Sequence, residues 1–248
     1  MADIDIREQA SQIIDQLVNT SYSQIFDISP LERDLNVMHM NNPNIAEPLI
    51  GMMFCSIMLG NKPLAIEYGN KIWHLHQELE DEIEMLYADC LINVGLFEKA
   101  QNLISEKMND VKKNIELYYT TVVKYALYTG DLYILNNLAQ YPQIYNADPL
   151  LFDFAEKYYT GINNKHYNAI LKIINDTVGN AICTTEYSVL EDNHIELNLY
   201  TSTNTEENIK NQTLIADKIN SYYLSMQEQN NNDISVTIEN INLHTEWW

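Results

Sequence analysis

The stretch that decides the fold is Asp81–Ile104, which reads DEIEMLYADCLINVGLFEKAQNLI. On both sides of Gly95, apolar residues recur at a spacing of three and four, which places them on one face of an α-helix. Glycine adopts the left-handed backbone conformation that ends helices without steric cost, and only a few residues remain for a turn. The stretch therefore predicts two antiparallel helices joined tightly at Gly95.

The same unit recurs along the chain. Gly60, Gly95 and Gly130 lie 35 residues apart, and each is followed by a second apolar segment. Units of helix, turn and helix that repeat with a period in the mid-thirties are typical of stacked helical hairpins. The residues five places after these glycines are small or aliphatic: Ala65, Ala100 and Leu135.

Two of these units resemble a known family. GNKPLAIEY, which starts at Gly60, and GLFEKAQNLI, which starts at Gly95, are similar to the turn and second helix of the tetratricopeptide repeat. The resemblance covers about residues 46–142. It is degenerate, because Gly69 replaces an aromatic residue and because other residues stand where the family often has tryptophan: Leu49, Glu84 and Tyr119. The resemblance implies an α-hairpin solenoid in which the first helix of each unit lines a concave face.

We expect this solenoid to occupy residues 1–178. A helix over 3–19 and a second helix that starts at Ser29-Pro30 and runs to about Met40 form a divergent first unit (3–40). In the fourth pair we expect a longer turn over Gly161–Lys165 and an aromatic first helix, whose rings serve either the groove or, as we favour, the core. The remaining units are expected at about 46–76, 81–110, 115–141 and 149–177.

The pattern changes after Gly179. Ile195, Leu197 and Leu199 alternate with polar residues, which predicts a half-buried strand. Strands over 182–190 and 234–238 and a helix that opens at Thr205 complete a small β-β-α-β domain over 179–248. It has little apolar surface of its own, so we expect it to dock against the last helix of the array. The fold class is thus mainly α with a small C-terminal α/β domain.

The charge restricts the partners. The formal net charge is −21, from 14 Lys+Arg and 35 Asp+Glu. Such a surface repels nucleic-acid phosphates and anionic membranes and favours encounter with basic proteins. The three cysteines form no CxxC motif, and the acidic residues near the N-terminus interrupt any signal-peptide core. We therefore expect reduced, buried cysteines and a cytoplasmic location, and the oligomeric state stays open.

The resemblance also implies a partner-binding groove, because in the family the first helices contact bound segments. The family's carboxylate-clamp residues are absent, and what remains is an apolar strip edged by acids, suited to a segment with apolar anchors and basic flanks. The alternative is that part of this strip is buried by packing between repeats or covered by the terminal helix. We refer to the following residues as the predicted groove: Glu47, Ile50, Phe54, Ile57, Met58, Glu82, Met85, Asp89, Asn93, Leu117, Lys124 and Tyr128.

Catalytic motifs are absent from the sequence: it has no GxGxxG, P-loop, GxSxG or HExxH pattern. His74, His76, Glu78 and Glu80 cannot converge on one metal ion if they lie on a continuous helix. His194, Glu196 and Tyr200 share the polar face of a predicted strand, which fits either an acid/base group or a solvated face. We expect no metal site and no cofactor.

These observations lead to a hypothesis about the function of the protein. The sequence favours a non-catalytic protein-binding module, an adaptor or chaperone-like holder of a partner segment. One alternative is an acidic, immunity-type inhibitor of a basic toxin or enzyme, and another is an enzyme with its site in the C-terminal domain. Trp247 and Trp248, at the end of the sequence, either pack on the small sheet or insert into another protein.

Overall fold

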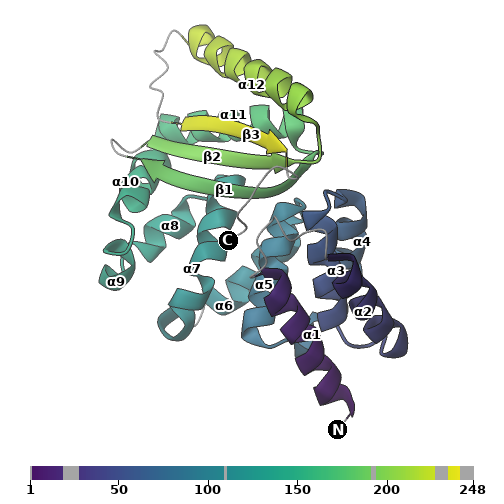
Figure 1. Ribbon diagram of the computed structural model, residues 1–248. Helices are drawn as coiled ribbons and strands as arrows, with labels where there is room; N and C mark the ends of the chain where they lie inside the picture. Colours follow the sequence, from purple (N-terminus) through teal and green to yellow (C-terminus); the bar gives the residue numbers. More distant parts are fainter. Residues whose placement is uncertain (1, 19–27, 109–110, 191–193, 227–233, 241–248) are drawn as a thin grey trace. The chain divides into compact units, whose positions relative to one another are not determined.

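The computed structural model describes residues 2–18, 28–108, 111–190, 194–226 and 234–240 (Figure 1). The chain divides into two compact units, with the boundary between Leu117 and Tyr118. Unit 1 contains the described residues up to Leu117, and unit 2 contains those from Tyr118 to Asn240. The domain boundary expected at residue 179 lies inside unit 2. Each unit is described by itself.

Unit 1 is helical and follows the predicted hairpins. The N-terminal helices α1 and α2 both pack on α3, while α3 packs against α4 and α5 against α6. α2 begins at Ile28, one residue before the predicted start at Ser29. The elements are α1 (Ala2–Val18), α2 (Ile28–Asn41), α3 (Glu47–Met58), α4 (Lys62–Ile72), the short 3₁₀ helix η2 (His76–Glu78), α5 (Asp81–Asn93), α6 (Phe97–Met108) and the start of α7 (Val111–Thr129).

The two hairpins of unit 1 turn in the same way. Gly60 and Gly95 have positive φ values of 70° and 82°. After α3, the Asn61 amide donates to Ser56 O at 2.7 Å and the Gly60 amide to Ile57 O at 2.9 Å. The equivalent bonds after α5 also form, at 2.8 and 3.0 Å. This pair of bonds is the Schellman motif, which satisfies the last carbonyls of a helix and favours glycine. The predicted turns at Gly60 and Gly95 are confirmed.

Gly69 lies where the first hairpin meets the second. A Cβ atom at this position would lie 3.1 Å from Met53 Cε and 3.2 Å from Leu96 Cδ1. The carbonyl of Gly69 accepts a hydrogen bond of 2.7 Å from the buried hydroxyl of Tyr87. The glycine that departs from the family pattern therefore permits a close approach of α4 to the second hairpin.

Unit 2 departs further from the expectation. Gly130 again has a positive φ, 74°, but α8 after it has only six residues and packs against α10. α11 begins at Gly161, so the longer turn expected over Gly161–Lys165 is wrong. The elements are the rest of α7, α8 (Tyr133–Leu138), α9 (Pro142–Tyr145), α10 (Pro149–Tyr158), α11 (Gly161–Val178), β1 (Ile182–Leu190), β2 (His194–Thr201), α12 (Thr205–Ser225) and β3 (Ile234–Asn240).

Aromatic side chains of α10 fill the core of unit 2, as predicted. Phe152, Phe154 and Tyr158 are all buried. Phe154 stacks on Tyr158 with ring centroids 4.7 Å apart and meets the edge of Tyr167 at 5.7 Å. The Tyr167 hydroxyl donates to Leu127 O at 2.7 Å, which links α11 to α7.

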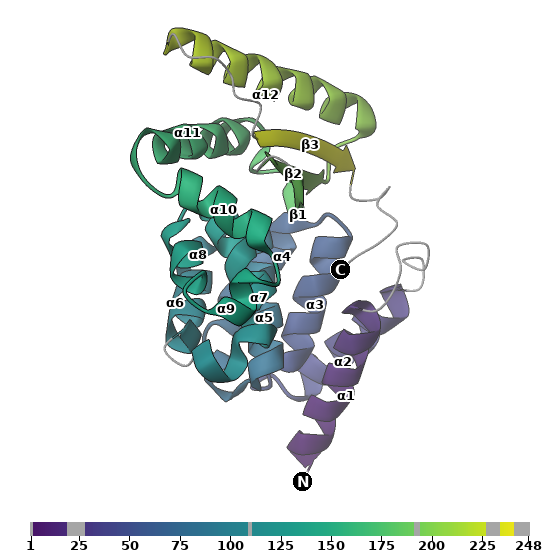
Figure 2. The same cartoon turned by 90° about the vertical axis from the view of Figure 1, so that its left-hand side faces the viewer.

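The predicted β-β-α-β order is confirmed. The sheet has the order β1-β2-β3, with β1 antiparallel and β3 parallel to the central strand β2. Between β2 and β3 the chain forms α12, which packs on β3 and on α11, so the sheet is docked on the helices before it (Figures 1 and 2). The Asn204 side chain caps α12 by accepting from Glu207 N at 2.9 Å.

Unit 2 also buries the predicted face of β2, because Ile195, Leu197 and Leu199 are at most 1% exposed. All three cysteines are free and buried, as expected. In the part of the chain that the structure describes, no helix is both long and apolar enough to cross a membrane. The prediction for Trp247 and Trp248 lies outside the described residues.

Candidate functional site

The predicted groove residues of α3 lie in the interior. Ile50, Phe54, Ile57 and Met58 are at most 1% exposed, and Glu47 is 4% exposed. α3 is covered by α1, α2, α4 and α5, which explains why every residue of this helix is buried. The Glu47 carboxylate lies 3.8 Å from Arg7 Nε, so its burial is compensated by a cation from α1.

The α5 part of the predicted groove contains a buried polar pair. Met85, Asp89 and Asn93 are buried, whereas Glu82 is exposed. The Asn93 side-chain amide donates to Asp89 Oδ2 at 3.1 Å. Its carbonyl oxygen, Asn93 Oδ1, is buried and has no hydrogen-bond partner among the described residues.

The remaining groove residues belong to α7. Lys124 and Tyr128, in unit 2, are buried. The Tyr128 hydroxyl donates to Glu186 O at 2.8 Å, and burial raises the pKa of this phenol. The side chain of Leu117 lies outside the described residues. The described groove side chains, Glu82 excepted, are thus closed off from solvent and present no open apolar surface in this structure.

The polar face of β2 does not form one acid/base group. The three residues singled out from the sequence each bond to a different neighbour. His194 Nε2 lies 2.9 Å from Ser235 Oγ, Thr237 Oγ1 donates to Glu196 Oε1 at 2.9 Å, and Tyr200 donates to Glu186 Oε2 at 2.9 Å. The serine and histidine have the contact of a nucleophile and base, but the described residues supply no third group that orients the imidazole, which such a pair needs.

His74 and His76 do not lie on a continuous α-helix, because α4 ends at Ile72. His76 Nδ1 lies 2.7 Å from Trp73 O. Glu78 is turned toward α1, where its carboxylate pairs with the Arg7 guanidinium and its carbonyl accepts from Arg7 Nη1 at 2.9 Å. Within the described ranges, no three His, Cys, Asp or Glu side chains are placed to share a metal ion.

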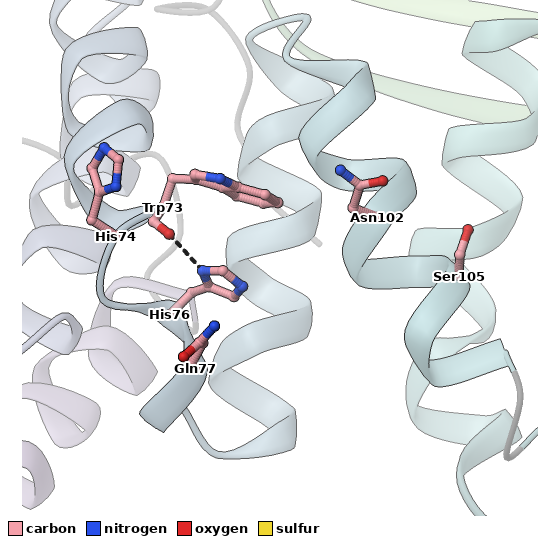
Figure 3. Close-up of a pocket in the computed structure, with 6 residues that line it drawn as sticks. All are labelled: Trp73, His74, His76, Gln77, Asn102 and Ser105. Atoms are coloured by element: carbon pink, nitrogen blue, oxygen red, sulfur yellow. Dashed lines mark hydrogen bonds between the residues drawn. The ribbon is translucent and has the colours of Figure 1, made fainter.

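A polar pocket of about 590 Å³ lies beside these histidines, between the end of α4 and the surface of α6 (Figure 3). The segment after α4 forms one wall, and two side chains of α6 form the facing wall. All of its lining residues belong to unit 1. They are Trp73, His74, His76, Gln77, Asn102 and Ser105.

The wall after α4 is held by a stack of rings. The His76 imidazole stacks on the Trp73 indole with centroids 4.6 Å apart and planes 21° apart. The Lys99 ammonium lies over the same indole, 5.3 Å from its centroid, and donates to Asn70 Oδ1 at 2.6 Å. Burial lowers the pKa of Lys99. These contacts tie α6 to α4 and fix the position of Trp73.

The bond to Trp73 also defines the tautomer of His76. A carbonyl oxygen only accepts, so Nδ1 carries the proton and donates. In the neutral ring, Nε2 then presents a lone pair, and Figure 3 shows this nitrogen on the side of the ring toward α6. The pocket could not be predicted from the sequence, because Trp73 and Asn102 approach each other only through the packing of two hairpins. The usable signal was a tryptophan, Trp73, close to two histidines, His74 and His76.

Comparison of the chain with profiles of known protein families, with curated protein sequences and with solved structures finds no match.

Proposed function

We propose that this protein is a non-catalytic binding protein, an adaptor or chaperone-like module of tetratricopeptide-like architecture, that holds a segment of a partner protein. Two features of unit 1 support the proposal. The hairpins α3–α4 and α5–α6 use the same glycine turn, and their first helices, α3 and α5, lie against each other. Repeated hairpins of this kind present equivalent residues at regular intervals along a curved surface, which suits an extended partner.

The observation that carries the proposal is the polar pair on α5. Asn93 Oδ1 is buried without a partner among the described residues, and a buried, unsatisfied acceptor costs about 1–3 kcal/mol. The bond to the buried Asp89 carboxylate accounts for the nitrogen of the Asn93 amide, but it leaves the oxygen without a donor among the described residues. A peptide N–H group of a bound segment is a donor that would satisfy Asn93 Oδ1.

The burial of the groove adds a condition. Phe54 and Met85 are 1% and 3% exposed, so a segment can reach them only if the side chains that cover them move aside. Opening the groove costs free energy, and the binding of the partner's apolar anchors must offset that cost. The net charge of −21 supports a partner with basic flanks, since it accelerates encounter with cations at low salt.

Site-specific photo-crosslinking in an extract of the source cells tests the proposal. A benzophenone amino acid replaces Met85 in the groove or, as a matched control, the exposed Glu67 on α4. We expect adducts with other polypeptides at position 85, fewer adducts at high salt, and none at position 67. Asn93→Leu, combined with the probe at position 85, should reduce the adducts while circular dichroism stays unchanged. Equal labelling at both positions would contradict the groove.

The same experiment also tests the alternative function, an acidic inhibitor of a basic toxin or enzyme. Its support is the excess of carboxylates, many of which are exposed on helix surfaces, such as Glu67 and Glu82. An inhibitor that covers a basic enzyme uses exposed acids and needs no opening of the core. Adducts at position 67 alone, with a single basic protein, would favour this function over segment binding.

A further inference from the structure

We propose that the pocket between α4 and α6 binds an uncharged amide, either the main chain of a peptide or a side-chain amide. This site shares no residue with the predicted groove and does not rest on the function proposed for it. Its lining combines five polar side chains with one indole, and its volume of about 590 Å³ lies within the usual range of ligand sites.

The charges of the pocket disfavour ionic ligands. Among the described residues, no carboxylate lines it, so a bound ammonium or guanidinium would find no counter-ion there. Lys99, which lies over the Trp73 ring, is already bonded to Asn70 Oδ1. An anion would be repelled by the negative potential of a chain with a net charge of −21. A neutral ligand avoids both penalties.

The hydrogen-bonding groups match an amide. Gln77 and Asn102 each carry an amide that both donates and accepts, and Ser105 contributes a hydroxyl that does the same. On α6, Asn102 and Ser105 are three residues apart and therefore face the same side. His76 adds an acceptor at Nε2 in its neutral form. A peptide group offers one N–H and one C=O, which this set satisfies together.

The ring stack argues against a sugar as the ligand. Carbohydrate sites that use tryptophan leave one face of the indole open for the sugar ring. Here His76 covers one face of Trp73, and the Lys99 ammonium also lies over the ring. The indole therefore acts as a fixed wall, while the hydrogen-bonding groups on the two sides of the pocket hold the ligand.

Nuclear magnetic resonance titration of the full-length protein tests this proposal with blocked amino acids as probes. N-acetylglycine methylamide carries only main-chain amides, and N-acetylasparagine methylamide adds a side-chain amide. We expect saturable shifts of the Trp73 indole and Asn102 amide signals, identified with Trp73→Phe and Asn102→Leu. The blocked aspartate and lysine analogues should bind at least about tenfold more weakly, because each brings an uncompensated charge. Equal binding of the two neutral probes assigns the main chain as the ligand, and tighter binding of the asparagine probe assigns the side chain.

Two substitutions complete the test. Asn102→Leu removes an exposed amide of the lining and should weaken the neutral probe about tenfold. Gln101→Leu, at the neighbouring exposed position outside the lining, is the matched control and should leave binding unchanged. His76→Phe keeps a ring on Trp73 but removes the acceptor, and should weaken binding as well. No saturable shift with either neutral probe, or equal weakening by Gln101→Leu, would overturn the proposal.

Discussion

The turns at Gly95 in unit 1 and at Gly130 in unit 2 share their backbone conformation but not their surroundings. Their φ values are 82° and 74°. After Gly95 the chain forms the twelve-residue helix α6, which packs along α5, whereas after Gly130 it forms only the six-residue helix α8. A Cβ atom at Gly95 would meet nothing within 4 Å, but at Gly130 it would lie 2.1 Å from Asn168 Oδ1. The repeat in the sequence therefore determines the turn and not the packing around it.

The residues after each glycine explain the difference. Following Gly95, the apolar pattern continues through Ile104 without a break. Following Gly130, it ends at Leu138, and Pro142 starts the separate helix α9. Proline lacks the amide that a continuing helix needs and disfavours helical backbone in the residue before it. Unit 2 thus loses most of a second repeat helix and builds its core on α10 and α11 instead.

The core of unit 2 is rich in tyrosine, and this gives the largest effect we expect. Burial raises the pKa of a tyrosine because the phenolate would lose its hydration. Burial raises the pKa of Tyr187 to about 12, and it also raises the pKa values of Tyr128 and Tyr167 above their usual range. Among the described residues, burial raises the pKa of two tyrosines in unit 1, Tyr68 and Tyr87, and of six in unit 2: Tyr119, Tyr125, Tyr128, Tyr167, Tyr187 and Tyr200.

We predict that alkaline pH destabilises unit 2 before unit 1. The unfolded chain releases each phenolic proton near pH 10 while the folded chain retains it, so the stabilisation is complete below about pH 10 and falls as the pH rises. Each tyrosine that keeps its proton in the folded chain contributes a loss of about 1.4 kcal/mol per pH unit, and three of them contribute about 4 kcal/mol. Hydrogen exchange resolved by residue, from pH 9 to 11, measures this. Earlier loss of protection in α3–α6 than in α10–α11 would refute it.

The second prediction compares alanine at the two glycines. Gly95→Ala forces an L residue into the left-handed region and should lower the free energy of unfolding by about 1–2 kcal/mol. Gly130→Ala adds the displacement of Asn168, whose amide donates to Asn164 O and Oδ1 at 2.9 Å, and should cost about 2–4 kcal/mol. Urea denaturation measures both. Equal losses would show that Asn168 rearranges freely.

The two turns also show what sequence reasoning could and could not reach. Periodic glycines and alternating residues such as Ile195 and Leu197 report local conformation, and the hairpin turns and β2 were predicted correctly. The start of α11 was predicted wrongly. The sequence suggests that Gly161 belongs to a turn, but in the structure it is the first residue of the helix and has a positive φ. The pocket depends on the approach of α6 to Trp73, which no local pattern encodes.

The third prediction concerns one buried hydroxyl in each unit. Tyr87 donates to Gly69 O and Tyr167 donates to Leu127 O, both at 2.7 Å. Replacing either tyrosine with phenylalanine preserves the ring but leaves a buried carbonyl with one acceptor site unfilled, which should cost about 1–3 kcal/mol. Thermal denaturation monitored by circular dichroism gives the two losses. Tyr167→Phe should in addition reduce the alkaline destabilisation of unit 2, because the removed phenol no longer titrates. If Tyr167→Phe lowers the stability but leaves the pH profile unchanged, Tyr167 does not contribute to the alkaline destabilisation of unit 2.

The smallest effects come from one lysine in each unit that joins two helices. Lys99 Nζ donates to Asn70 Oδ1 at 2.6 Å and lies over the Trp73 ring, whereas Lys218 Nζ donates to Thr177 Oγ1 at 2.9 Å. Methionine keeps most of the length and packing of the side chain, so Lys218→Met should cost about 0.5 kcal/mol for one part-buried hydrogen bond. Lys99→Met should cost about 1–1.5 kcal/mol, because it also removes a cation–π contact worth about 0.5–1 kcal/mol. Chemical denaturation at low and high salt measures both losses, and the difference between them should persist in salt because neither bond is an ion pair. If Lys99→Met leaves the Trp73 indole resonance and the stability unchanged, the contact between α6 and Trp73 is too weak to hold the wall of the pocket, and the fixed ring stack on which the binding site depends is lost with it.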